Sequence, residues 1–219
     1  MTSTITLHAP SLLPASGKPP RQIIILLHGY GSNGADMMSL APHWRHAFPD
    51  ALFLAPNGPE RCPGSPGGYQ WWALTAFSRP ALAAGVKRAA PVLDGFIDQQ
   101  LAQHGLSEDK LLLIGFSQGT MLALHVGPCR EKAVAGIIGY SGMIADTTGL
   151  AGKIQSRPPV LLVHGAEDTV VPVAALNEAQ LELHRLGFDV QTHIAPGLGH
   201  GVDANGLRLG EAFARKVLG

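Results

Sequence analysis

Cysteine is scarce in this sequence, and so is an excess of charge of either sign. Cys62 and Cys129 are its two thiols among 219 residues, too few and too far apart for a disulfide framework or a zinc site. We expect free thiols, although a single disulfide stays open. Lysine and arginine total 16, as do aspartate and glutamate. This balance argues against partners such as nucleic acid or an anionic membrane surface.

Long apolar runs are missing as well. No stretch approaches the ~18 consecutive apolar residues of a membrane-spanning helix. The first residues also lack the positive charge and apolar segment of a secretory signal. We therefore expect a cytoplasmic protein with no stable membrane association. The length suits one α/β domain with a full core, and we take residues 1–219 as a single domain.

The sequence does contain a strand–turn–helix signature around Ser117. An apolar run ends at Gly115, the chain turns through Gly-x-Ser-x-Gly, and good helix formers follow from Thr120 to His125. This is the pattern of a nucleophile elbow, in which strained backbone lifts the serine hydroxyl clear of a sheet. With 27 glycines in the chain, an accidental match is a real risk. The identification of a nucleophile elbow therefore depends on the predicted strand before Ser117 and the predicted helix after it.

Predicted strands and helices alternate along the chain, which indicates a mostly parallel sheet with helices on both faces. Buried strands are expected at 23–27, 51–55, 110–115, 134–139 and 159–163, an edge strand at 188–194, and a possible short one from Ile5 to His8. Asp36 is expected to cap a helix whose apolar stripe includes Leu40, Trp44 and Phe48, and Ser78 to cap a long helix that ends at Gly105. Two further helices follow, with apolar stripes at 176–186 and 209–217. The stretch from Pro56 to Arg79 shows no periodicity.

Ser117, Asp168 and His200 each follow a predicted strand, so they should meet at one edge of the sheet. Their order along the chain is that of an α/β-hydrolase triad. A serine hydroxyl is a poor nucleophile until a base takes its proton, and an imidazole can take that proton and return it. A buried carboxylate then fixes the imidazole tautomer. Since the base must be neutral, kcat/KM should rise through one ionisation near neutrality.

Ten histidines compete for the role of base. His200 is chosen because it lies downstream of the acid in a loop flanked by glycines. His28 and His164 also end strands, but each precedes a glycine, where hydrogen bonding of the turn is the expected role. The alternatives to Asp168 among the acids are Glu167, Asp146 and Asp203.

Several short motifs carry a resemblance that spans residues 23 to 201: Leu27-His28-Gly29-Tyr30-Gly31, Ala55-Pro56-Asn57-Gly58-Pro59-Glu60, Gln70-Trp71-Trp72, Gly115-Phe116-Ser117-Gln118-Gly119, Tyr140-Ser141-Gly142, His164-Gly165-Ala166-Glu167-Asp168 with Val171-Pro172, and Gly199-His200. The chain resembles the bacterial branch of the phospholipase/carboxylesterase family, which also contains acyl-protein thioesterases. The resemblance implies a single-domain α/β-hydrolase fold and serine ester hydrolysis without a metal or organic cofactor.

The same resemblance implies site residues. Ser117 would be the nucleophile, Asp168 and His200 its partners, and the N–H groups of Tyr30 and Gln118 the oxyanion hole. Two positions depart from the family pattern: Tyr30 stands where leucine is common, and Thr120 where a second glycine is common. In the family arrangement Trp71 and Trp72 reach the strand ends, where we expect them to bind substrate as a short apolar wall; the alternative is that one or both are core anchors.

These observations predict a carboxylesterase for short- to medium-chain esters, acting on a small-molecule substrate through an acyl-enzyme. A lysophospholipase or an acyl-protein thioesterase is the alternative, and a serine peptidase or acyltransferase would use the same triad. A non-catalytic domain that binds a hydrophobic ligand is the alternative of a different class. For the oligomeric state, the sequence is compatible with both a monomer and a homodimer.

Overall fold

A seven-stranded sheet forms the centre of the structure, a computed structural model that describes residues 7–219. The strand order is β1-β3-β2-β6-β7-β8-β9. β1 runs antiparallel to β3, and all other neighbours in this sheet pair in parallel. The strands are β1 (Ser11–Leu12), β2 (Gln22–Leu27), β3 (Ala51–Leu54), β6 (Leu111–Phe116), β7 (Gly136–Tyr140), β8 (Val160–Gly165) and β9 (Val190–Ala195). The mostly parallel sheet predicted from the sequence is confirmed.

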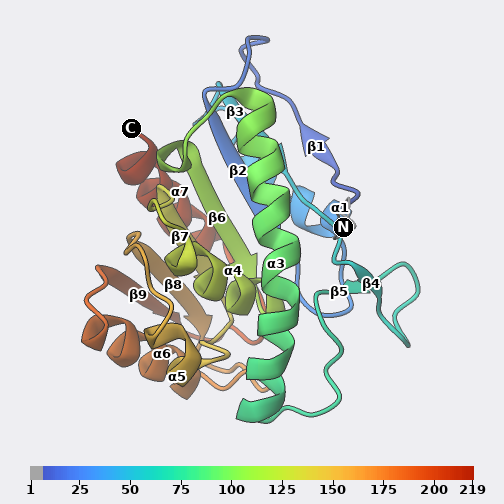
Figure 1. The fold of residues 1–219 in the computed structure, drawn as a ribbon, viewed down its shortest axis with the longest axis vertical. Helices are drawn as coiled ribbons and strands as arrows, with labels where there is room; N and C mark the ends of the chain where they lie inside the picture. Colours follow the sequence, from blue (N-terminus) through green and yellow to red (C-terminus); the bar gives the residue numbers. More distant parts are fainter. Residues whose placement is uncertain (1–6) are drawn as a thin grey trace.

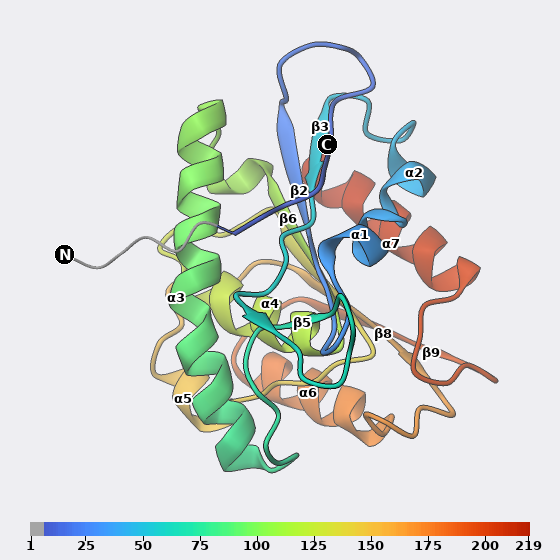
Figure 2. The same ribbon diagram turned by 90° about the vertical axis from the view of Figure 1, so that its right-hand side faces the viewer.

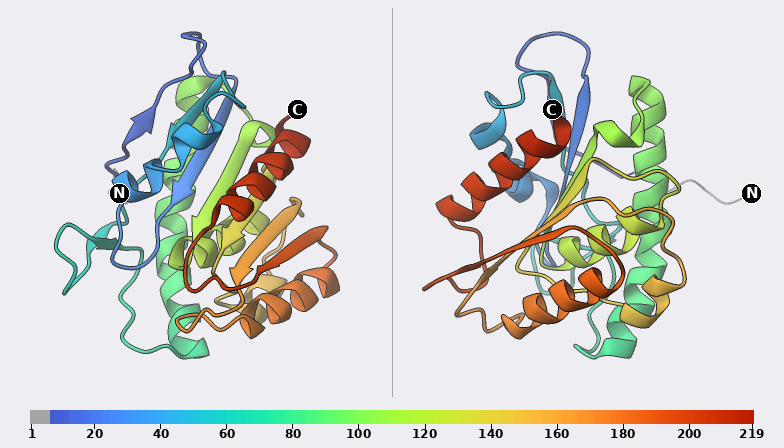
Figure 3. Two further views of the ribbon diagram at one scale, coloured as in Figure 1. Left: turned by 180° about the vertical axis from the view of Figure 1, so that it is seen from behind. Right: turned by 90° about the vertical axis from the view of Figure 1, so that its left-hand side faces the viewer.

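Helices cover both faces of this sheet, as Figure 1 and the view from behind in Figure 3 show. Apolar residues of α3, α4, α5 and α6 pack in one core cluster, and those of α1, α2 and α7 in a second cluster on the other face. The helices are α1 (Gly34–Met38), α2 (Ala41–Trp44), α3 (Arg79–His104), α4 (Gln118–Cys129), α5 (Thr147–Ala151), α6 (Ala174–Arg185) and α7 (Ala204–Leu218), with a 3-10 turn at Glu108–Lys110. None of these helices is long and apolar enough to cross a membrane.

The long helix α3 begins and ends where the sequence predicts. The side chain of Ser78 accepts a hydrogen bond from the N–H of Ala81, and Pro80 occupies the first turn. Gly105 closes the helix with φ 63°, a left-handed conformation that glycine adopts at little cost. Figure 2 shows α3 standing along one side of the sheet, beside α4.

Several local predictions need correction. Ile5 and Thr6 fall outside the described residues and Leu7–His8 is not a strand; β1 instead forms this edge of the sheet, opposite the edge formed by β9. The predicted helix around Trp44 is two short helices, and Asn33 rather than Asp36 caps α1. The stretch before α3 contains a small hairpin of β4 (Glu60–Arg61) and β5 (Tyr69–Gln70). Helix α5 was not predicted, because five residues are too few to show a helical period.

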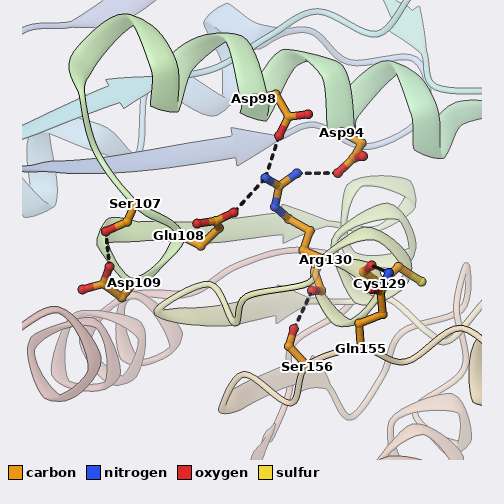
Figure 4. Close-up of polar contacts among 10 residues, drawn as sticks. Asp94, Asp98, Ser107, Glu108, Asp109, Cys129, Arg130, Gln155 and Ser156 are labelled. Carbon is orange, nitrogen blue, oxygen red and sulfur yellow. Dashed lines mark hydrogen bonds and ion pairs between the residues drawn. The ribbon is translucent and has the colours of Figure 1, made fainter.

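Arg130 fixes the far end of α4, the helix that follows Ser117. Its guanidinium is buried and pairs with Asp94 and Asp98 of α3 and with Glu108 of the 3-10 turn (Figure 4). The buried guanidinium thus links the end of α4, which follows β6, to α3 and the 3-10 turn, which precede β6. Asp94 and Asp98 are themselves exposed, but a buried guanidinium needs partners for its charge, so these contacts help to hold the end of α4 against α3.

Candidate active site

Ser117 stands in a sharp turn between β6 and α4. Its backbone has φ 53° and ψ −113°, a strained conformation for a residue other than glycine. A methyl group added at Gly115 would overlap the N–H of Thr120, and one added at Gly119 would overlap the carbonyl oxygen of Leu27. Glycine is therefore required on both sides of Ser117, as the sequence predicts for a nucleophile elbow.

Asp168 and His200 meet at the same edge of the sheet, after β8 and β9. His200 Nδ1 lies 2.7 Å from Asp168 Oδ2. The other carboxylate oxygen, Oδ1, accepts the backbone N–H groups of Val170 and Val171 at 2.9 and 2.8 Å. Burial would raise the pKa of Asp168, but the hydrogen bonds from His200 and these two N–H groups outweigh it and lower the pKa. Asp168 is thus an ionised carboxylate that orients the imidazole.

The loop that carries His200 is held against the sheet by Ser141. The buried Ser141 hydroxyl donates to the carbonyl oxygen of Gly201 at 3.0 Å, and its own backbone has φ 48°. The ring of Phe116, which precedes Ser117, lies 4.9 Å from the ring of His200, centroid to centroid. Among residues 7–219 Ser117 Oγ and His200 share no direct hydrogen bond, and such bonds often tighten only once substrate is bound. Ser141 belongs to the Tyr140-Ser141-Gly142 motif, but nothing in that motif predicts its contact with the His200 loop.

The residues considered as alternatives to Asp168 and His200 lie in other surroundings. Asp146 caps α5 and Asp203 caps α7 through their side chains, while Glu167 is exposed. His164 is buried and bonds the carbonyl oxygen of Val171 through Nε2, which confirms its expected role in the turn.

The two proposed oxyanion donors border Ser117. A methyl group added at Gly29 would lie 3.3 Å from Ser117 Cβ, so the Gly29–Tyr30 peptide adjoins the nucleophile. Gln118 opens α4, where the first N–H groups of a helix have no partner within that helix. Within the described chain neither the N–H of Tyr30 nor that of Gln118 donates to a backbone or side-chain acceptor. Both are thus available to a negatively charged oxygen at Ser117.

Trp71 and Trp72 do not form the exposed wall that we expected. Each is 1% exposed, and both belong to the core cluster beneath α3 and α4. Their backbone engages the Gln118 side chain: the N–H of Trp71 donates to Oε1, and Nε2 donates to the carbonyl oxygen of Trp72, both at 2.9 Å. The two aromatic rings fill the core rather than the mouth of the site: the Trp72 ring packs against Gly85 of α3, and the Trp71 ring stacks on His28.

Neither the thiols nor the acids form a metal centre in the described residues. No group of three or more potential ligands occurs within residues 7–219. Cys62 and Cys129 are unpaired thiols.

The chain is similar to proteins of one family along almost its full length. Residues 11–218 match the model of the family described as phospholipase/carboxylesterase. An esterase from Escherichia coli strain K12, YpfH, is 28% identical over 201 residues, which cover 92% of this chain and 85% of that protein. Acyl-protein thioesterase 1 of Gibberella zeae is 27% identical over 233 residues, which cover 96% of each chain.

A solved structure agrees with this match. The crystal structure of esterase PE8 superposes with a TM-score of 0.94 at 42% sequence identity, covering 98% of this chain and all of that one.

Proposed function

The chain belongs to the phospholipase/carboxylesterase family, and on that premise we propose that it hydrolyses short- to medium-chain carboxylic esters with Ser117, His200 and Asp168 as its catalytic triad. It is a carboxylesterase, a hydrolase that acts on ester bonds. The observation that supports these residue roles is the 2.7 Å contact of His200 with a buried Asp168, at the sheet edge where Ser117 stands in its strained turn.

In the first half of the proposed reaction, His200 takes the hydroxyl proton as Ser117 Oγ bonds to the carbonyl carbon of the ester. The carbonyl π electrons move to oxygen, and that oxyanion accepts the N–H groups of Tyr30 and Gln118. The C–O bond to the alcohol then breaks, and the alcohol leaves with the proton from His200. An acyl-Ser117 ester remains, as in other enzymes with this triad.

In the second half, water replaces the alcohol. His200 takes one water proton as the water oxygen bonds to the acyl carbon, and the same two N–H groups bind the oxyanion. The bond to Ser117 Oγ breaks, Oγ regains a proton from His200, and the acid departs. Asp168 stabilises the imidazolium in both halves and keeps its own ionised state.

The preference for short and medium acyl chains rests on the exposed apolar side chains beside the site. Tyr30, 40% exposed, follows Gly29, which adjoins Ser117. Val170 is also exposed and lies two residues after Asp168. Each buried methylene contributes about 0.8 kcal/mol, roughly fourfold in rate or affinity, for as long as apolar surface remains to cover it. A few exposed side chains cover a few methylenes, so the gain should end at medium length.

Replacing the nucleophile tests the mechanism. Ser117→Ala should fold with an unchanged melting temperature and lose esterase activity by roughly 10⁴–10⁶, because the triad acts as a unit. A fluorophosphonate probe should label the wild type and leave the variant unlabelled. A folded variant that retains a tenth of wild-type turnover would overturn the assignment of Ser117.

A thioesterase activity is the second candidate, because curated relatives named acyl-protein thioesterase 1 match most of this chain. A matched oxyester and thioester with the same acyl group separates the two functions by kcat/KM. Absence of turnover on both would instead favour the non-catalytic binding domain. A cytoplasmic location is part of our proposal and agrees with the unpaired thiols of Cys62 and Cys129.

A further inference from the structure

His28 is fully buried in the loop next to Ser117, and its two ring nitrogens have different partners. Nε2 lies 2.8 Å from the backbone nitrogen of Gly58, and Nδ1 lies 2.7 Å from the carbonyl oxygen of Gly29. A backbone N–H can only donate, so Nε2 accepts and the ring proton resides on Nδ1. Burial lowers the pKa of His28, which keeps the ring neutral. His28 is therefore held in one tautomer and donates to Gly29.

This bond helps to fix where a proposed oxyanion donor points, together with the N–H of Ser32, which donates to the same Gly29 oxygen at 3.2 Å. The carbonyl oxygen of Gly29 and the N–H of Tyr30 belong to one peptide group. Such a group is planar, and in its trans form the oxygen and the N–H point in opposite directions. By holding the oxygen, His28 and the Ser32 N–H also restrict the N–H of Tyr30, in a peptide that adjoins Ser117. The hydrogen bond polarises the same peptide, which strengthens its N–H as a donor.

Trp71 connects this peptide to the second donor. Its indole Nε1 donates to the carbonyl oxygen of His28 at 3.0 Å, and its ring stacks on the His28 ring at 5.4 Å and 27°. The backbone N–H of Trp71 donates to the Gln118 carboxamide, which in turn donates to the carbonyl oxygen of Trp72. Through the covalent structure of His28 and Trp71, these buried hydrogen bonds connect the Gly29–Tyr30 peptide with Gln118, the residue that supplies the other N–H.

We propose that the side chains of His28, Trp71 and Gln118 are positioning residues that hold the two oxyanion donors at a fixed separation. The proposal rests on the proposed function, because it assumes that these N–H groups bind the oxyanion. It assigns Trp71 a role in catalysis without contact to substrate. Loosening the donors should lower kcat and spare KM, because the oxyanion exists after substrate has bound.

Two adjacent tryptophans provide a matched experiment. Both rings are 1% exposed, but within residues 7–219 the indole N–H of Trp72 has no acceptor. Trp71→Phe removes a hydrogen bond together with some ring volume, whereas Trp72→Phe removes the same volume without a hydrogen bond. Any loss that the two variants share is a packing effect, and the ratio between them isolates the indole N–H.

We expect kcat of Trp71→Phe to fall about tenfold below that of Trp72→Phe, a fraction of the ~10²–10³ lost with a whole oxyanion donor. KM should agree between the two within about twofold. An alkyl boronic acid, which forms a tetrahedral adduct with an active serine, should bind Trp71→Phe weaker by the same factor as kcat falls. Equal kcat in the two variants, or a loss that appears in KM instead, would overturn the proposal.

Gln118→Met tests these hydrogen bonds at their Gln118 end. It is the deciding test of the proposal if Trp71→Phe does not fold. It preserves the backbone N–H and the approximate volume of the side chain but removes both carboxamide hydrogen bonds. A loss in kcat of about tenfold at unchanged KM is expected, and wild-type kcat would contradict the proposal. Ser117→Ala in the same assay distinguishes a failure of the proposed function from a failure of the positioning proposal. If activity survives Ser117→Ala, the proposed function itself fails, whatever the other variants show.

Discussion

Nε2 of His164 lies 3.2 Å from Asp168 Oδ2, the same oxygen that His200 Nδ1 approaches at 2.7 Å. Because His164 Nε2 also lies 2.7 Å from the carbonyl oxygen of Val171, it must carry a proton, since a carbonyl only accepts. The single proton on His164 Nε2 is donated to Val171, so Oδ2 accepts from His200 Nδ1 with the protonated nitrogen of His164 nearby, while Oδ1 accepts from two backbone N–H groups. The groups that bond to this carboxylate are all hydrogen-bond donors, so both of its oxygens must act as acceptors.

Asp168→Asn should therefore fail for a specific reason. Oδ1 must remain an oxygen to accept from Val170 and Val171, so the new NH₂ group takes the place of Oδ2. There it faces His200 as a donor and stabilises the wrong imidazole tautomer. We expect kcat to fall by about 10⁴, the effect of the same change in another Ser-His-Asp enzyme. Steady-state kinetics check this, with circular dichroism to show that the variant is folded.

Glu167→Gln is the matched control. It makes the same chemical change, carboxylate to carboxamide, at the residue immediately before Asp168. The Glu167 side chain is exposed, so this variant should retain kcat within about twofold. An Asp168→Asn enzyme as active as this control would show that Asp168 does not orient the base.

The position of the triad was predictable because parallel strands bring their carboxyl ends to one edge. Ser117, Asp168 and His200 all follow strands, and that rule needs no side-chain detail. The supporting contacts were not predictable in the same way. Ser141 meets Gly201 across 60 residues of sequence, and no local pattern encodes such a contact.

The two tryptophans show a second limit. Trp71 and Trp72 lie in a stretch without periodicity, so the sequence does not tell an exposed wall from a core anchor. Their burial depends on contacts distant in sequence: Gly85 of α3 lets the Trp72 ring pack closely, because a methyl group there would overlap it, and the Trp71 ring stacks on His28. The break between α1 and α2 was missed for a similar reason, because apolar side chains at Met37, Leu40 and Trp44 continue across it at helical spacing.

Gly119→Ala should destroy the elbow. Its methyl group would overlap the backbone of β2 at Leu27, which cannot move without disturbing the central sheet. We expect a loss of more than about 3 kcal/mol in the free energy of unfolding, or no folded protein, from this overpacking and strain. Denaturant titration measures the change.

Gly95→Ala is the control for that substitution. Gly95 lies within α3, and no atom would come within 4 Å of its added methyl group. Alanine there should raise the free energy of unfolding by about 0.5–1 kcal/mol. If Gly119→Ala were as stable as Gly95→Ala, the close approach of α4 to β2 would be wrong.

His125 makes stability depend on pH. It is 5% exposed, and in the described part of the chain its Nδ1 has no hydrogen-bond partner. Burial lowers the pKa of His125, although Asp146 opposes the shift. The unfolded chain therefore binds a proton more readily, so the free energy of unfolding should fall as pH drops below about 6.5. His28 adds to this fall, because burial lowers its pKa too.

His125→Leu tests this dependence. The variant should show a smaller fall in the free energy of unfolding between pH 7 and 5, by at most about 1.4 kcal/mol per pH unit for one group. Equilibrium urea denaturation at several pH values gives the slopes. Identical slopes in the variant and the wild type would show that His125 does not carry a lowered pKa.

Tyr30 rather than Trp71 or Trp72 should determine the response to acyl length. Tyr30→Ala retains the backbone N–H proposed for the oxyanion hole but removes an exposed ring beside the nucleophile. In the wild type we expect kcat/KM on aryl esters to climb from acetate to hexanoate by up to about fourfold per methylene, then to level off. Tyr30→Ala should flatten that climb and leave acetate hydrolysis within about threefold, because acetate hardly reaches the ring.

The control is Leu181→Ala, which removes a large apolar and more exposed side chain from α6. It should leave the whole chain-length profile unchanged, since α6 does not carry a residue of the proposed site. Trp72→Ala should instead lower the melting temperature and reduce activity on all esters alike, because deleting a buried tryptophan costs about 3–5 kcal/mol. A wild-type optimum at palmitate would contradict the short apolar surface. A steep climb that persists in Tyr30→Ala would place the acyl chain elsewhere, against side chains that Tyr30 does not adjoin.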